Sequence, residues 1–278
     1  MDRIAQFQKA NPGSEVWISA KNMDTGGRFA LGENQKVRTA STIKLPILCA
    51  VYQGVSEGRW KLTDKLVLRD TDKVSGSGII REFDDGTQLS IRDAMHVMIV
   101  VSDNTATNLI LDRITADYVN ECCDRWKLPA TRSMRKVRGD GNQLKAPTGW
   151  SKAGMLEENK RYGLGSTTPA EMVSLLERLE RGEIVSAEAS KEMIAILKRQ
   201  QLKEGIGRRV EATMPVASKS GSLDALRSDV GIVYSPAGRM VIAITVDGMP
   251  KIDYSFDNVG NLLITDLTDC LLEGLRKA

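Results

Sequence analysis

The sequence predicts an α+β fold, in which one antiparallel sheet built from both ends of the chain is flanked by helices and carries an inserted all-helical domain. Strand-like runs occur before about residue 36 and after about residue 210, and apolar residues recur at helical spacing between them. A last amphipathic segment closes the chain. Because strands from the two ends of one chain can pair, we expect a discontinuous α/β domain at 1–36 and 205–278 and a helical domain at 37–204.

The first segment begins with a short helix and continues as a hairpin. Residues 2–10 have the pattern of a helix that "NPG" at 11–13 stops. "EVWISAKN" at 15–22 alternates apolar and polar residues, as a half-buried strand does. The turn "DTGG" at 24–27 leads to "RFALG" at 28–32, and together these stretches predict a hairpin.

From about residue 41 to 202 the chain is predicted to be mostly helical. Apolar positions recur with the helical period in the stretches 43–55, 91–101, 105–114, 170–179 and 187–197. "TTPAEM" is typical of a helix start, because Thr168 suits the cap, Pro169 the first turn and Glu171 the third position. The Gly-rich, polar segment 138–166 lacks such a period, and loops of this length are usually functional or disordered.

Strands return after about residue 210. "MPVASKSG" at 214–221, "DVGIVYS" at 229–235 and "RMVIAITVDG" at 239–248 are rich in β-branched residues, and the turn "SPAG" joins the last two. A final amphipathic helix is predicted over 256–276. Its apolar face is formed by Val259, Leu263, Leu267, Cys270 and Leu271.

Composition and charge exclude several classes of protein. Hydrophobic residues make up 41% and charged residues 27% of the 278 residues, which is ordinary for a globular protein. The net charge is +3 and the basic residues are dispersed, with the densest run, 132–138, interpreted as solvated surface. No stretch approaches the roughly 18 apolar residues of a membrane span. We therefore expect no nucleic-acid partner and no membrane span. We also expect a monomer that acts on a small-molecule substrate.

Cysteine and histidine usage predicts no metal and no cofactor. The four cysteines show neither metal-ligand spacing nor a disulfide framework, and the one histidine, His96, is predicted to be structural. We expect Cys49 and Cys270 to lie on apolar helix faces as small hydrophobic residues. The N-terminus lacks the pattern of a signal peptide. The sequence as it stands therefore predicts a cytoplasmic protein, or a periplasmic or secreted one if a signal has been removed.

Three short motifs carry the candidate chemistry, and the first is "STIK". It places Ser41 one turn before Lys44 at a helix start, so that the two side chains share a face. A serine hydroxyl needs a base within hydrogen-bond reach, and a lysine kept neutral by burial or by nearby positive charge can be that base. The spacing alone is not specific, since Ser133 and Lys136 repeat it.

The other two motifs are "SDN" at 102–104, between two predicted helices, and "KSG" at 219–221, on a predicted strand. Each alone is equally typical of a helix cap or of a strand that ends in a turn. The three in this order are the signature of penicillin-recognising serine enzymes. The chain therefore resembles the class A β-lactamase family over nearly its whole length. The resemblance implies a β-lactamase/transpeptidase-like fold with the active site between the two domains.

The resemblance implies three catalytic residues. Ser41 is the nucleophile that attacks an amide or ester carbonyl, and Lys44 is its general base or proton relay. Ser102 passes a proton to the leaving nitrogen, with help from Lys219. The backbone N–H groups of Ser41 and Ser222 form the oxyanion hole, which stabilises the charge that develops on the carbonyl oxygen.

The resemblance also implies the groups that bind substrate. Asn104 hydrogen-bonds a substrate amide. Lys219 attracts a substrate carboxylate by its charge, and Ser220 binds that carboxylate through its hydroxyl. Such carboxylate contacts favour anionic substrates, because hydrogen bonds between charged groups are the strong ones.

One part of the family pattern is missing. Class A β-lactamases have a loop glutamate that activates water to release the acyl group, and this sequence has Val137 at the aligned position. Glu157 and Glu158 are candidate water-activating residues in the long loop, as is Asp140, although loop carboxylates are more often simply solvated. "DKVSGSGII" at 72–80 resembles a β-lactamase-related group of hydrolases that lacks the glutamate.

The sequence therefore predicts a serine hydrolase that forms a covalent acyl-enzyme on Ser41 and hydrolyses β-lactams with slow deacylation. An esterase or a D-amino-acid peptidase would use the same pair of Ser41 and Lys44. A β-lactam-binding sensor would be acylated without turnover. These alternatives stay open at the level of sequence, because each needs the same acylation machinery.

Overall fold

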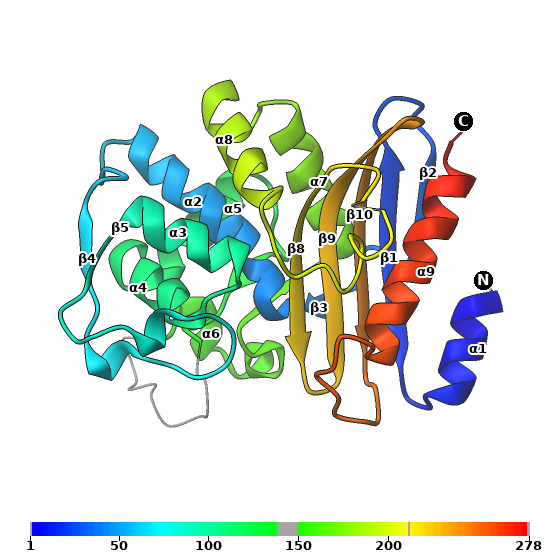
Figure 1. The fold of residues 1–278 in the computed structure, drawn as a ribbon, viewed down its shortest axis with the longest axis horizontal. Helices are drawn as coiled ribbons and strands as arrows, with labels where there is room; N and C mark the ends of the chain where they lie inside the picture. The colour runs from blue at the N-terminus through cyan, green and yellow to red at the C-terminus, as the bar shows by residue number, and fades with distance from the viewer. Residues whose placement is uncertain (1, 138–148, 211, 277–278) are drawn as a thin grey trace.

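A computed structural model describes residues 2–137, 149–210 and 212–276 of the chain. Its centre is a five-stranded antiparallel sheet with the strand order β2-β1-β10-β9-β8 (Figure 1). The strands are β1 (Glu15–Asn22), β2 (Arg28–Leu31), β8 (Val216–Leu223), β9 (Leu226–Ser235) and β10 (Gly238–Asp247). Because β1 pairs with β10 along its whole length, the two ends of the chain share one sheet. This arrangement confirms the predicted fold class.

The two faces of the sheet bury separate apolar cores. Successive residues of a strand point to opposite faces, so β8 contributes Val216 to one core and Ala217 to the other. The first core is covered by α1 (Asp2–Ala10) and α9 (Val259–Gly274), and α7 (Pro169–Glu180) packs against the opposite face. The sheet is therefore the middle layer of three, with helices on both sides.

The other long helices are α2 (Lys44–Ser56), α3 (Ile91–Val100), α4 (Asn104–Ile114), α5 (Ala116–Arg125) and α8 (Ala187–Leu197). Figure 1 shows α2 to α5 gathered beyond the β8 end of the sheet. All the predicted helical stretches are helices, and the Thr168 hydroxyl accepts from the Glu171 N–H at 3.1 Å, as its capping pattern predicts. The sequence prediction missed α5, which is short and interrupted by polar residues.

The middle region is helical but not all-helical, which corrects the prediction. Two small sheets occur there: β4 (Lys65–Val67) with β5 (Gln88–Ser90), and β7 (Gly165–Thr167) between β3 (Val37–Arg38) and β6 (Arg132–Ser133). These strands are two or three residues long, too short to show a period in the sequence. Tertiary pairing, not local pattern, therefore holds them.

The long segment predicted as an irregular loop contains regular structure in its described part, residues 149–166. A one-turn helix, α6 (Lys152–Met155), is capped by Ser151, whose hydroxyl accepts from the Gly154 N–H at 3.0 Å. A 3-10 helix, Glu157–Tyr162, follows and leads into β7. The remainder, 138–148, lies outside the described residues. Capping and 3-10 turns of this length leave no periodic signal, which explains the wrong prediction.

The predicted division at residues 36/37 and 204/205 stays a prediction. α7 belongs to the segment predicted as the helical domain, yet it packs against β1, β9 and β10. Its apolar side chains Met172 and Leu175 join the core that lies between the sheet and the helices. The two parts of the chain therefore share one continuous apolar layer at this face of the sheet.

The local pattern predicted the burial of one cysteine correctly and overstated that of another. Cys49 on α2 is buried, as predicted, but Cys270 on α9 is exposed. Leu263, Leu267 and Leu271 form the buried stripe of α9, and Cys270 lies at the exposed flank of that stripe. The prediction for Cys270 was therefore wrong, because helical spacing alone does not set how wide the covered stripe is.

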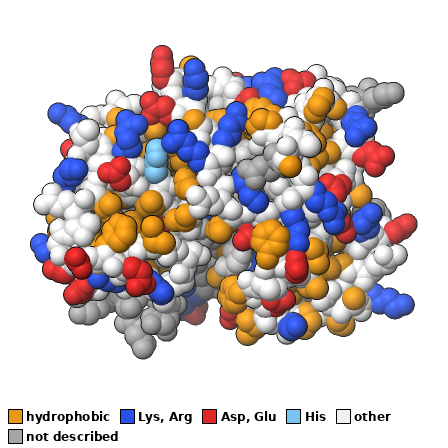
Figure 2. Space-filling model, in the orientation of Figure 1, with side chains coloured by type: hydrophobic (Ala, Val, Ile, Leu, Met, Phe, Trp, Pro, Cys, Tyr) orange, Lys and Arg blue, Asp and Glu red, His pale blue; other side chains and the backbone are white. Residues whose placement is uncertain are grey.

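The surface carries mixed charges. Figure 2 shows acidic and basic side chains interspersed over the visible face. The basic run 132–138 is interpreted from sequence as solvated, but its described part, 132–137, is partly buried: Met134 has no exposure, and Arg132 and Lys136 pair with Asp124 and Asp112, respectively. In the described part of the chain, no helix has the length and hydropathy to cross a membrane.

Candidate active site

Ser41 lies in the 3-10 helix Ala40–Ile43, which leads directly into α2. The preceding residue, Ala40, has φ 47°, a left-handed conformation that non-glycine residues rarely adopt. Such strain persists only where the surrounding structure holds it, and it is concentrated at functional sites. Ser41 opens onto a cavity of about 790 Å³ at the β8 edge of the sheet. The backbone thus presents the hydroxyl at a fixed place on the cavity wall.

Lys44 begins α2 and is fully buried. Its Nζ donates to the carbonyl oxygen of Ser102 at 2.7 Å, to the Ser102 hydroxyl at 3.2 Å and to Asn104 Oδ1 at 2.9 Å. Burial, together with the positive charge of Lys219, lowers the pKa of Lys44 well below its ordinary value, and Asp103 opposes this shift. The lowered pKa makes Lys44 easier to deprotonate than an exposed lysine, and the neutral amine can accept a proton.

The predicted partners of Lys44 are therefore brought together, with one difference. Among the described residues, the hydrogen bonds of Lys44 go to the 102–104 junction, and none joins its Nζ to the Ser41 hydroxyl. The Ser102 hydroxyl, which accepts from Lys44, lies on the same cavity wall as Ser41. Catalytic hydrogen bonds in a ligand-free site often form only when substrate is bound.

The junction between α3 and α4 is held by Asp103. One carboxylate oxygen accepts from the Ala106 N–H at 2.7 Å and caps α4. The other accepts from the N–H groups of Ile79 and Ile80 at 2.7 and 2.9 Å, which anchors the segment 75–80 over the site. Ser102 has φ 55°, a strained backbone conformation for a residue other than glycine. The hydrogen bonds of the next residue, Asp103, hold the backbone of this junction in place.

Lys219 lies on β8 and is fully buried. Its Nζ donates to the Ser220 carbonyl oxygen at 2.6 Å and to Gln200 Oε1 at 3.2 Å. Burial lowers the pKa of Lys219 to about 7, against the opposing charges of Asp229 and Glu204. Its charge is therefore present below neutral pH and is lost as the pH rises through about 7.

The backbone of β8 is aimed at Ser41. The Ser220 N–H points away from β9 and donates to Gln200 Oε1 at 3.0 Å. In an antiparallel ladder alternate residues point the same way, so the Ser222 N–H also points outward, toward the cavity that Ser222 lines. Gly221 permits the approach, because a Cβ there would lie 2.9 Å from the Ser41 nitrogen. The Ser222 N–H therefore faces the cavity that Ser41 also lines.

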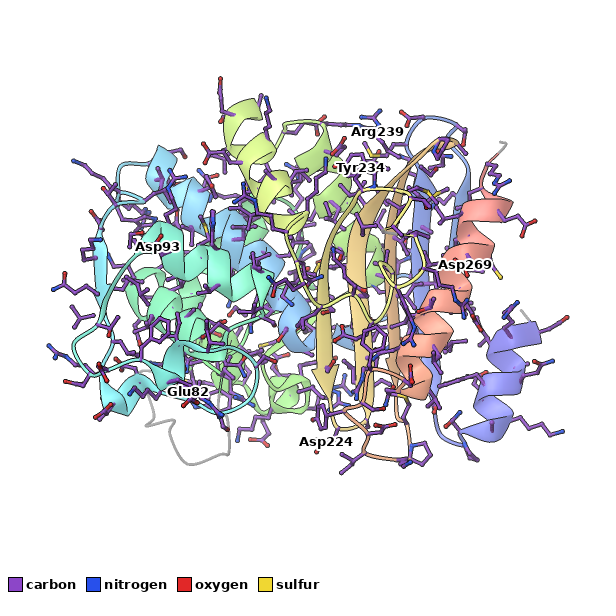
Figure 3. The ribbon with its side chains drawn as sticks, viewed as in Figure 1. Glu82, Asp93, Asp224, Tyr234, Arg239 and Asp269 are labelled. Carbon is purple, nitrogen blue, oxygen red and sulfur yellow. The ribbon has the colours of Figure 1, made fainter. Side chains whose placement is uncertain are left out.

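The rest of the cavity wall combines small, cationic and acidic residues. Ser75, Gly76 and Ser77 form one side, and Asn104 Nδ2 donates to the Ser75 carbonyl oxygen at 3.1 Å. At the opposite rim, Figure 3 shows Asp224 where β8 turns into β9. The Tyr254 hydroxyl donates to Asp224 at 2.6 Å, so the tyrosine and the acid form one wall of the entrance.

The position aligned with the missing glutamate also lies on this cavity. Val137 lines it, and its N–H and C=O bond to the Asn108 side chain at 2.7 and 3.0 Å. Glu157 and Glu158 lie in the 3-10 helix and are exposed; the Glu157 side chain is 83% exposed and pairs with Lys160. Neither is among the described residues that line the cavity. The structure therefore does not bring these two carboxylates to the site.

The sequence prediction missed three residues of the site and its support: Asp103, Gln200 and Asp229. Asp103 stands inside a recognised motif but was given no role of its own. Asp229 leaves a signal, a carboxylate inside an apolar strand, whereas nothing in the local sequence marks Gln200. Asp140, named as a candidate water-activating residue, lies outside the described part. Across the described residues, no group of three or more His, Cys, Asp or Glu side chains is placed to hold a metal ion.

The antiparallel sheet between helices, with a Ser-x-x-Lys turn facing a Ser-Asp-Asn junction and a Lys-Ser-Gly edge strand, defines a serine β-lactamase-like fold. The comparisons agree, and the chain belongs to the β-lactamase enzyme family, whose model matches residues 1–275. It is 24% identical over 247 residues to β-lactamase L2 of Stenotrophomonas maltophilia, which covers 84% of this chain and 73% of that relative.

Solved structures give the same result. The β-lactamase from Sphaerobacter thermophilus DSM 20745 has a TM-score of 0.82 and 30% sequence identity, covering 98% of this chain and 96% of that chain. PBP-A has a TM-score of 0.80 and 25% identity, covering 99% and 96%. The family and the fold together support a hydrolase that acts on small-molecule β-lactams.

Proposed function

We propose that this protein hydrolyses β-lactams through a covalent acyl-enzyme on Ser41. The observation that carries the proposal is the fully buried Lys44, one turn from Ser41 and hydrogen-bonded to Ser102, with a pKa lowered well below its ordinary value. A neutral amine in that position can take the proton of a serine hydroxyl.

Acylation proceeds in two steps. Ser41 Oγ attacks the carbonyl carbon of the β-lactam while its proton passes to Lys44, and the N–H groups of Ser41 and Ser222 stabilise the oxyanion. The ring C–N bond then breaks, and the Ser102 hydroxyl donates a proton to the leaving nitrogen. Ser102 recovers its proton from Lys44, to which it is hydrogen-bonded at 3.2 Å. Lys44 ends neutral, and the acyl group is an ester of Ser41.

Substrate recognition uses the other wall of the cavity. Lys219 and Ser220 bind the carboxylate of the substrate, and Asn104 binds the amide of its side chain. Support comes from the position of Ser220 and Asn104 on the cavity wall and from the buried charge of Lys219 beside them. A charge held in a water-poor site attracts an anion more strongly than one at the surface does.

We propose that deacylation is the slow step. Release of the acyl group needs a base that activates water, and the aligned position carries Val137. A solved structure of a leucine-to-glutamate mutant of PBP-A, 25% identical to this chain, is an acyl-enzyme complex with penicillin G. That complex supports acylation of this fold by a penicillin, and we extend it to Ser41.

The apolar Val137 also supports a second candidate function, a β-lactam-binding sensor that is acylated and does not turn over. An esterase or a D-amino-acid peptidase would use the same Ser41 and Lys44 on another carbonyl. The sensor differs from the hydrolase in that the acyl group is not released, and the esterase or peptidase differs in the substrate that supplies the acyl group. In all of them the acyl group is attached to Ser41 in the same way.

A fluorescent penicillin separates these candidates. For a hydrolase with slow deacylation we expect a product burst, slow steady turnover and an adduct on Ser41 visible by intact mass spectrometry. A permanent label indicates the sensor. No label in the wild-type protein, tested alongside Ser41→Ala, contradicts β-lactam acylation and directs the search to esters and D-amino-acid peptides.

A further inference from the structure

Gln200 covers the outward side of β8, the edge strand of the sheet. It follows α8, and its side chain is almost fully buried, with 2% exposure. Its Oε1 accepts from Lys219 Nζ at 3.2 Å, from the Ser220 N–H at 3.0 Å and from the Ser220 hydroxyl at 3.4 Å. Its Nε2 donates to the Ser218 hydroxyl at 2.9 Å. One amide therefore contacts three consecutive residues of the strand.

This contact pattern is possible only at an edge. Side chains of successive strand residues point to opposite faces, so Lys219 extends from the face of Ala217 and Ser220 from the face of Val216. A group packed on one face would reach one of the two but not the other. Gln200 lies in the plane of the sheet, where a neighbouring strand would pair, and reaches both.

The chemistry of the amide suits the groups that it contacts. Lys219 Nζ and the Ser220 N–H are donors, so the amide must present its oxygen to them, and the bond from Nε2 to Ser218 locks that orientation. The amide oxygen is also neutral. A carboxylate there would form an ion pair with Lys219 and compete with an incoming anion, whereas an apolar group would leave buried donors unpaired.

We propose that Gln200 is a positioning residue, which holds the Lys219 ammonium and the Ser220 hydroxyl as one anion-binding pair without neutralising its charge. It thereby sets the preference of the site for substrates that carry a carboxylate. The inference rests on the proposed function in one respect, that Lys219 and Ser220 receive the substrate carboxylate. Gln200 itself does not line the cavity among the described residues, so it acts through these two side chains.

The test measures recognition without chemistry. In a Ser41→Ala background no acyl-enzyme forms, so the dissociation constants of benzylpenicillin and of its methyl ester can be compared by titration calorimetry. We expect Gln200→Met, which keeps the length and removes the polar atoms, to weaken benzylpenicillin about tenfold, the effect of one hydrogen bond to a charged group. The methyl ester should change by less than about twofold, because it offers no charge to Lys219.

Gln200→Glu is a second test of the inference, which remains valid even if Gln200→Met does not fold. Its carboxylate keeps an acceptor beside Lys219 but pairs with the charge, so the preference for the acid over the ester should fall here too. Gln201→Met, at the exposed neighbouring position, is the matched control and should bind both ligands as the parent does. Thermal unfolding of each variant shows whether the fold is retained.

The outcomes are distinct. A loss confined to the acid supports the inference. Equal losses on acid and ester overturn it and leave Gln200 a structural tie between α8 and β8, and so does an unchanged preference in both variants. A parent that binds the acid no better than the ester overturns it as well. Acylation of the protein with Ser41 intact, measured by intact mass spectrometry, tests the proposed function separately. Failure of the proposed function is therefore not confused with failure of the inference.

Discussion

The two sides of the cavity hold their polar groups in different ways. On the acylation side, Lys44, Ser102 and Lys219 have almost no exposure. Lys44 donates to the carbonyl and hydroxyl oxygens of Ser102, and Lys219 donates to the carbonyl oxygen of Ser220. On the side where the family keeps its water-activating glutamate, the cavity wall presents Val137. The carboxylate of Glu157, proposed from sequence as a substitute, is exposed and pairs with a surface lysine.

In the proposed mechanism, the two half-reactions depend on separate structural features. Acylation uses lysines whose pKa values burial lowers, and burial comes from the meeting of α2, the α3–α4 junction and β8. The proposed deacylation needs a carboxylate that activates water, but Val137 occupies the aligned position, and Glu157 and Glu158 are not among the described residues that line the cavity. A protein can therefore retain the first half-reaction at full strength while the second is weak.

The largest effect is expected from Ser41→Ala. Without the hydroxyl no acyl-enzyme forms, so turnover and covalent labelling should fall by at least about 10³-fold, as for other nucleophile deletions. Thermal unfolding should be unchanged, because Ser41 opens onto the cavity. Retention of more than a few per cent of the turnover would show that another group attacks the substrate.

Val137→Glu should accelerate deacylation, so that the second half-reaction is no longer slow. A carboxylate at this cavity position adds the missing base, and general-base catalysis contributes about 10²–10⁴-fold to the step that it serves. We expect the adduct on Ser41 to become short-lived and the burst to merge into fast steady turnover. Val137→Gln has a similar shape without the base and is the control. If both variants release the acyl group equally fast, water access and not a base limits deacylation.

The pH dependence of substrate recognition tests the role of Lys219 on the acylation side. Burial lowers the pKa of Lys219 to about 7, so its positive charge is present below that pH and is lost above it. The ratio of kcat/KM for a penicillin acid to that for its methyl ester should therefore fall as the pH rises through about 7, by up to about tenfold. Lys44 serves both substrates equally and cancels in the ratio.

Substitutions of Lys219 and of a charged residue near it test this pH dependence. The positive charge of Lys219 lowers the pKa of Lys44, while the negative charges of Asp229 and Glu204 raise the pKa of Lys219. Asp229→Asn should move the fall in the ratio toward more acidic pH, and Lys219→Ala should abolish the pH dependence of the ratio. A ratio that stays constant from pH 5 to pH 9 in the wild-type protein would mean that Lys219 does not read the carboxylate.

The smallest effect is expected on the exposed carboxylates. Glu157→Gln and Glu158→Gln should change the lifetime of the Ser41 adduct by less than about twofold, because surface charges of this kind contribute little. Intact mass spectrometry after rapid removal of free penicillin measures the lifetime. A markedly longer adduct lifetime in either variant would show that the 3-10 helix moves its carboxylate to the cavity during turnover.

The sequence by itself determined the order and kind of the main elements. Alternation in 15–22 and helical spacing in 43–55 or 170–179 are local consequences of the geometry of strands and helices, so they can be recognised without knowing what packs on them. The three motifs named Ser41, Lys44, Ser102 and Lys219, and the structure places all of them at one cavity or beside it. Motifs transfer because acyl transfer demands particular groups in a particular arrangement.

Only the tertiary structure decided how these groups are tuned. The burial that shifts the pKa values of Lys44 and Lys219 arises where segments distant in the sequence meet, and no local pattern reports it. The same holds for Gln200, which stands about twenty positions before the serine that it contacts, and for Glu157, which stands near the right loop but points to solvent. Desolvation is a property of the whole neighbourhood of an atom, so it is set by packing and not by the residues next to it in the chain.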